Sequence, residues 1–131
     1  GKTVEELKND NIVIVGEVED IKQYLKKPNI FVAPVRLGGG IKGKVLEAMA
    51  MGVPVVATTE AVSGIDYSVG DFALISDDTT VFADNIVRLY KDDILYQTLS
   101  NNSRKIVEEN YNWKMIAEKL NNFYLQKINK K

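Results

Sequence analysis

A glycine triplet and one carboxylate are the residues best suited to chemistry. Gly38, Gly39 and Gly40 follow an apolar run and precede a helical pattern. Glycines reach backbone angles closed to other residues and leave room for a ligand beside the main chain. Their amides and that of Ile41, at the start of the following helix, predict an anion site suited to a phosphate. A surface loop without a ligand is the alternative interpretation.

Glu47 lies in the next helical pattern, within the apolar stretch 45–50. A buried carboxylate is costly unless hydrogen-bond donors surround it. The vicinal hydroxyls of a ribose are suitable donors, but so is a structural partner such as Lys44, one turn earlier, or a backbone amide. The residues alone favour neither interpretation.

Two other phosphate-binding motifs match the same segment only in part. Gly38, Gly43 and Lys44 fit the G-x-x-x-x-G-K of a Walker A loop, but Val45 stands where a serine or threonine must hold magnesium. The dinucleotide motif G-x-G-x-x-G is met loosely by Gly38, Gly40 and Gly43, and its acidic follower comes too early. A magnesium-dependent ATP- or GTP-binding protein is therefore a minor alternative.

Composition excludes several classes of protein. The chain has 131 residues, 45% of them hydrophobic, which suits one globular domain. Its 17 basic and 18 acidic residues nearly cancel, so no broad field attracts nucleic acid. Without cysteine or histidine there is no disulfide, no thiolate metal site and no Ser-His or Cys-His nucleophile. With no leading apolar segment, we expect a cytoplasmic location.

The pattern of elements predicts an α/β fold. Short apolar runs predict strands at 12–15, 30–33, 54–58 and 72–76, and helical patterns predict helices at 20–26, 42–51 and 79–91. Two consecutive amphipathic helices are expected from residue 92 onward. This order predicts a mostly parallel sheet of about four strands with helices on both faces. A polar helical piece at 1–10 suggests that the chain starts within a domain whose earlier strands are missing.

The run PVRLGGGIKGKVLEAMAMGVPVVAT, residues 34–58, closely resembles the donor-site signature of retaining GT-B glycosyltransferases, called group 1 or family 4. Residues 15–20, 63–65 and 111–113 resemble further parts of the same family, so the resemblance covers nearly the whole chain. It implies that residues 1–131 form a single partial domain, the Rossmann-like, nucleotide-sugar-binding half of such an enzyme.

The resemblance also implies roles for individual residues. Of two glutamates that flank the family's donor site eight positions apart, the second, which hydrogen-bonds the ribose, matches Glu47. The first would fall at Gly39, so its contact with the transferred sugar is absent. The identity of the donor sugar is therefore not determined by the resemblance. Gly16 and Val18 match the region near the nucleotide base, although an ordinary turn is an equal interpretation of Gly16. Arg36, Lys42 and Lys44 lie close enough to the glycine segment in sequence to assist at the diphosphate, although Lys42 is also interpreted as part of a solvated basic face.

The activity implied is transfer of a hexosyl-type sugar from a nucleotide-diphosphate sugar to a glycan or lipid-linked acceptor, with retention and with neither cofactor nor metal. The family's acceptor site and its diphosphate-neutralising arginine and lysine fall outside the chain, so we expect the chain alone to be inactive. Peripheral membrane association of the complete protein is compatible with this activity, and a homodimer would fill the gap left by missing strands. The alternative is a non-catalytic α/β module that binds a nucleotide or a protein.

Overall fold

Three parallel strands form the centre of the structure, a computed structural model that describes residues 9–37, 42–65 and 70–110. The strands are β1 (Phe31–Ala33), β2 (Val55–Ala57) and β3 (Ala73–Ile75), in the order β1-β2-β3. Their register pairs Val32 with Val56 and Val56 with Leu74. The predicted parallel α/β fold is therefore confirmed, with three strands in the described part of the chain instead of about four.

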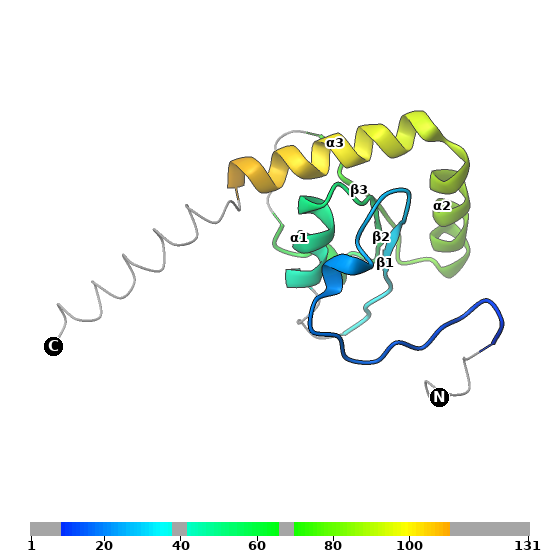
Figure 1. The fold of residues 1–131 in the computed structure, drawn as a ribbon. Helices are drawn as coiled ribbons and strands as arrows, with labels where there is room; N and C mark the ends of the chain where they lie inside the picture. Colours follow the sequence, from blue (N-terminus) through cyan, green and yellow to red (C-terminus); the bar gives the residue numbers. More distant parts are fainter. Residues whose placement is uncertain (1–8, 38–41, 66–69, 111–131) are drawn as a thin grey trace, which may run out of the picture.

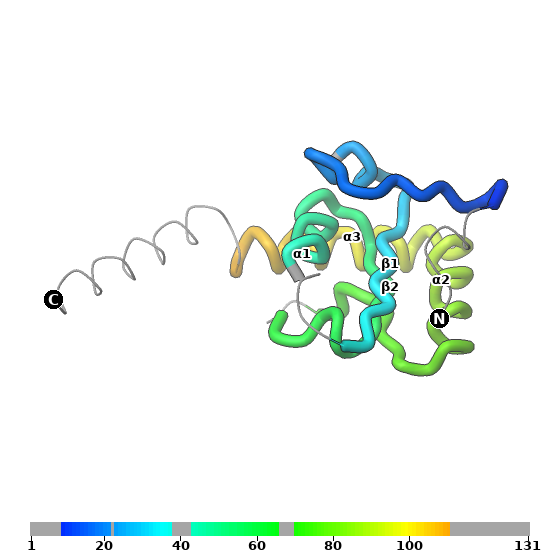
Figure 2. The backbone as a smooth tube through the Cα atoms, turned by 90° about the horizontal axis from the view of Figure 1, so that it is seen from below, coloured from blue at the N-terminus to red at the C-terminus, as the bar shows by residue number. Residues whose placement is uncertain are grey.

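Helices cover both faces of this sheet. Figures 1 and 2 show α1 (Lys42–Ala50) on one side of the strands and α2 (Thr79–Lys91) on the other, while α3 (Asp93–Asn110) crosses from α2 to α1. Two short 3₁₀ turns, η2 (Ile21–Gln23) and η3 (Glu60–Val62), complete the described elements. The second helix predicted after residue 92 lies outside the described residues.

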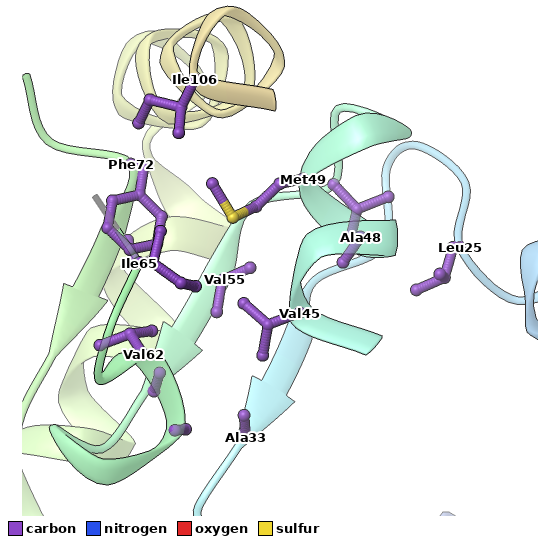
Figure 3. Packing of buried hydrophobic residues seen from close by; sticks show 14 residues of the cluster. Leu25, Ala33, Val45, Ala48, Met49, Val55, Val62, Ile65, Phe72 and Ile106 are labelled. Carbon is purple, nitrogen blue, oxygen red and sulfur yellow. The ribbon is translucent and has the colours of Figure 1, made fainter. Parts of the chain in front are cut away.

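The sheet separates two apolar cores because side chains alternate along each strand. Val55 and Ala57 point to the core beneath α1, whereas Val56 points to the core beneath α2. Figure 3 shows the first core, where Met49 of α1 lies between Val55 and Ile106 of α3. The run 54–58 thus reads as apolar without alternation because both faces of β2 are buried.

The boundaries of α2 follow from two aspartates. Asp78 precedes the helix and its Oδ1 accepts a 2.9 Å hydrogen bond from the backbone N–H of Val81. Asp92 ends α2 and at once opens α3, because its Oδ1 accepts from the backbone N–H of Leu95 at 2.9 Å. Such caps satisfy N–H groups that a helix leaves without partners, and α2 has the predicted bounds.

Two predictions about residues before β1 are wrong. Residues 12–15 form no strand: Ile12 makes only an isolated bridge with Asn9, and Val13 is 79% exposed. An apolar run becomes a strand only when a neighbour accepts its backbone hydrogen bonds, and no described strand lies beside this one. The helix predicted at 20–26 is reduced to the three residues of η2.

Candidate functional site

A hollow of about 630 Å³ lies between the segment leading into η2 and the amino end of α1. Its volume is within the range of small-molecule pockets, about 300–1,000 Å³. Figure 1 shows η2 beside α1, which begins after the carboxyl end of β1. The lining is Gly16, Glu17, Val18, Glu19, Asp20, Ile21, Gly43, Lys44 and Glu47.

Four of the eight residues predicted for donor binding meet in this hollow. Gly16 and Val18 come from the segment before η2, and Lys44 and Glu47 from the first two turns of α1. The spacing of Lys44 and Glu47 places both on one side of the helix. The other four, at 38–41, lie outside the described residues, so the predicted phosphate site there stays a prediction.

Gly16 has a backbone conformation that other residues rarely adopt. Its φ is +74°, and a Cβ added to it would meet no atom within 4 Å. Glycine is therefore required here by the backbone and not by lack of space. Gly16 lies between residues 13–15 and η2 and lines the hollow, so its conformation helps to shape the wall there.

Glu47 is half-buried and reaches the hollow, while its helix neighbours Val45, Ala48 and Met49 are fully buried. The alternative interpretation gave its carboxylate a structural partner, such as Lys44. In the described part of the chain, no hydrogen bond or ion pair joins the two side chains. Glu47 is thus a carboxylate at the edge of the core that faces space large enough for a ligand.

The lining is more acidic than the sequence interpretation anticipated. Glu17, Glu19 and Asp20 join Glu47, and Lys44 is the basic residue among these lining residues. No local pattern marks the three added acids as site residues, because they follow Gly16 in an irregular segment and reach the hollow only through the packing of η2 on α1. These carboxylates repel a phosphate because both are negatively charged. An anion in this hollow is therefore favoured only at the end formed by Gly43 and Lys44.

Val45 argues against the Walker A interpretation. Its side chain has no exposed surface and packs in the core beneath α1. A residue at this position of a Walker A loop must hold a magnesium ion at the ligand. The side chain at this position is therefore buried in the core, and it also lacks the hydroxyl that magnesium would need.

A second polar cluster, which the sequence interpretation missed, joins the loops that follow the three strands. Asp77, after β3, accepts hydrogen bonds at Oδ1 from the backbone N–H of Thr59 (2.9 Å) and at Oδ2 from its hydroxyl (2.8 Å). Those two bonds, with a smaller contribution from Arg36, hold the pKa of Asp77 below its usual 3.8. Arg36, after β1, donates from Nη1 to the backbone carbonyl of Asp77 at 2.7 Å.

Arg36 therefore lies away from the lining of the hollow, although its place in the sequence had suggested help at a diphosphate. Among the described residues, no group of three or more acidic side chains is arranged to hold a metal ion. Over the same residues, we find no helix with the length and apolar character needed to cross a membrane.

Comparisons with known proteins agree on one family. The family model described as "Glycosyl transferases group 1" matches residues 1–92, which include the whole lining of the hollow. Capsular polysaccharide biosynthesis glycosyltransferase CapM of Staphylococcus aureus is 33% identical over 120 residues, covering 88% of this chain and 31% of that protein. An uncharacterised glycosyltransferase of Methanocaldococcus jannaschii is 25% identical over 127 residues, covering 92% of this chain and 32% of that protein.

Among solved structures, sucrose-phosphate synthase of Thermosynechococcus elongatus is similar with a TM-score of 0.69 and 26% identity. The similarity covers 85% of this chain and 28% of that one. The chain thus spans about a third of the length of the proteins it matches.

Proposed function

Because the chain belongs to the group 1 glycosyltransferases, we propose that it forms the part of such an enzyme that binds a nucleotide-diphosphate sugar. The hollow supports this proposal, since it joins Gly16 and Val18 to Lys44 and Glu47. The sequence predicts that these four residues bind the same ligand, although they lie in two segments more than 20 residues apart. A shared cavity is what a common ligand requires.

The charges of the lining suggest how the donor lies. The ribose and base carry hydrogen-bond donors and no net charge, so they suit the side that holds Glu17, Glu19 and Glu47. The diphosphate, an anion, suits the amino end of α1, at Gly43 and Lys44, where the helix dipole is positive. In this orientation Glu47 accepts hydrogen bonds from the ribose hydroxyls.

For the complete enzyme, we propose transfer of a hexosyl-type sugar to a glycan or lipid-linked acceptor with retained configuration, and without a cofactor or metal. The developing charge on the leaving diphosphate would be stabilised by backbone amides and the dipole of α1. Groups for the acceptor would come from outside these 131 residues. The chain alone would then bind the donor without transferring its sugar, because both reactants must be held together for reaction.

Calorimetric titration with UDP, GDP, ADP, CDP and dTDP tests the donor site in the complete gene product that contains this chain. The key variant is Glu47→Gln, which keeps the shape of the side chain and removes its charge. A hydrogen bond to a charged group contributes about 1.5–3 kcal/mol, so the affinity for the diphosphate that binds should fall about tenfold or more.

Glu109→Gln is the matched control, because Glu109 is exposed on α3 and outside the lining of the hollow. Its affinity should equal that of the unmodified protein. If none of the five diphosphates binds, or if Glu47→Gln binds as well as the control, the proposed donor site is wrong.

A further inference from the structure

Few hydrogen bonds of the sheet hold the carboxyl end of β1. It has three residues and, in the described part of the chain, pairs only with β2. The last ladder bond runs from the backbone N–H of Thr58 to the carbonyl of Ala33, at 3.2 Å. The chain beyond Ala33 therefore needs other contacts to keep its place.

Side chains supply those contacts. The hydroxyl of Thr58 donates to the carbonyl of Val35, and the guanidinium of Arg36 donates to the carbonyl of Asp77 at 2.7 Å. The carbonyl of Asp77 is itself held, because the carboxylate of the same residue accepts two hydrogen bonds from Thr59. Arg36 thus ties the loop after β1 to a point that is fixed on both β2 and β3.

This tie acts next to α1. The helix follows β1 in the chain and packs on it, and Figure 3 shows Val45 of α1 close to Ala33 at the end of β1. Lys44 directly precedes Val45, Glu47 follows it by two residues, and both line the hollow. A shift of the end of β1 would therefore move Val45, which packs there. Lys44 and Glu47, on the same helix, would move with it.

We propose that Arg36 and Asp77 are positioning residues: they hold the carboxyl end of β1 so that α1 presents Lys44 and Glu47 to the hollow. They act through the backbone and touch no ligand. The effect on ligand binding rests on the proposed function, whereas the effect on α1 does not.

The first test needs no ligand. Amide chemical shifts of the 131-residue chain are compared by NMR for the unmodified protein, Arg36→Ala and Arg88→Ala, an exposed arginine of α2 that serves as control. Arg36→Ala should shift the amides of Gly43, Lys44 and Glu47 well beyond the control. Arg36→Lys, which keeps a donor for the carbonyl of Asp77, should bring them back toward their original values. If Arg36→Ala leaves these amides unmoved, the proposal is overturned.

The second test measures affinity for UDP and GDP in the complete gene product. Loss of one hydrogen bond should weaken binding about three- to tenfold for Arg36→Ala, with partial rescue in Arg36→Lys. In the double variant with Glu47→Gln, Arg36→Ala should cost less than it does alone, because its effect passes through the lost carboxylate.

The outcomes separate the two ideas. Additive losses would mean that the effect of Arg36 does not pass through Glu47, which contradicts the proposed positioning of that carboxylate. An unchanged affinity in Arg36→Ala, with Glu47→Gln still impaired, would reject the positioning role and keep the proposed function. Shifted amides in a protein that binds no diphosphate would support positioning of α1 and reject the proposed function.

Discussion

The hydroxyl of Ser100, on α3, donates a 2.7 Å hydrogen bond to the backbone carbonyl of Gly52, which lies 48 residues earlier in the turn before β2. Both residues are buried. The same helix bonds to the chain ahead of the other two strands, from the Tyr96 hydroxyl to the carbonyl of Asn29 (2.8 Å) and from the Ser103 hydroxyl to that of Phe72 (3.1 Å). α3 therefore anchors the amino ends of all three strands, opposite the edge from which the chain enters α1.

Replacing Ser100 with alanine should destabilise the fold. The change leaves the buried carbonyl of Gly52 without its donor, which costs about 1–3 kcal/mol. Urea unfolding followed by circular dichroism measures this loss. Thr98→Ala is the control, because the hydroxyl of Thr98 is exposed and bonds only within its own helix, to the carbonyl of Ile94; its effect should stay within about 0.5 kcal/mol. Equal losses in the two variants would contradict the anchoring role of Ser100.

Glycine-to-alanine changes at two positions should have opposite signs. Gly52 has a φ of +72°, and an added Cβ would lie 3.1 Å from the Ser100 hydroxyl and 3.0 Å from Cδ of Arg104. Alanine in this left-handed conformation costs about 1–2 kcal/mol before any clash. Gly43 lies in the first turn of α1 and its Cβ would meet nothing within 4 Å, so alanine there should stabilise the protein by about 0.4–1 kcal/mol, mainly by restricting the unfolded chain. Urea midpoints that move in the same direction would contradict this assignment.

Acid should weaken the protein partly through Asp77. Hydrogen bonds from Thr59 favour its carboxylate, so the pKa of Asp77 is lower in the folded protein than its ordinary 3.8. The stabilisation is present above 3.8 and is lost as the pH falls through the folded pKa. As the pH is lowered below 3.8, the free energy of unfolding of Asp77→Asn should therefore fall less steeply than that of the unmodified protein.

Asp84→Asn, at an exposed position of α2, is the control for this pH experiment, because it changes the net charge equally. The measurement is the free energy of unfolding across a pH series. An identical pH dependence in Asp77→Asn and the unmodified protein would show that the Thr59 hydrogen bonds contribute nothing to stability.

Sequence alone predicted the elements whose causes are local. The bounds of α2 were predicted correctly from the spacing that places Phe82, Ile86 and Leu89 on one face. The structure adds the local cause of its first residue, the cap formed by Asp78. The strand expected at 12–15 was wrong because its β-branched run has no neighbour to pair with in the described part of the chain, and pairing is a property of distant residues. Apolar character indicates what a segment would bury, but not whether a surface is there to receive it.

The same distinction applies to the site. Glu47 could be predicted as a candidate because a carboxylate within an apolar helix face is out of place, and the structure places it in the lining of the hollow. Glu17 and Asp20 are ordinary surface residues by sequence, and only the packing of η2 beside α1 brings them to the hollow. Arg36 was assigned by its nearness to the glycines, whereas its partner, Asp77, lies 41 residues away.

Gly16, which lines the hollow, should affect ligand binding when it is substituted. Valine at this position is disfavoured at the observed φ of +74°, by about 1–2 kcal/mol or more for a β-branched residue. Residues 13, 15 and 17 are exposed, so the segment can relax to another conformation more cheaply than the domain can unfold. Gly16→Val should therefore weaken UDP or GDP binding about tenfold with little change in the urea midpoint.

Asparagine is the matched variant, because it tolerates the left-handed region better than other residues with a side chain. There is space for it, since no atom lies within 4 Å of the Cβ position. Gly16→Asn should bind more tightly than Gly16→Val when both are titrated calorimetrically. If the two variants bind equally well, the backbone conformation at Gly16 does not control the hollow, and its glycine is then an ordinary turn residue.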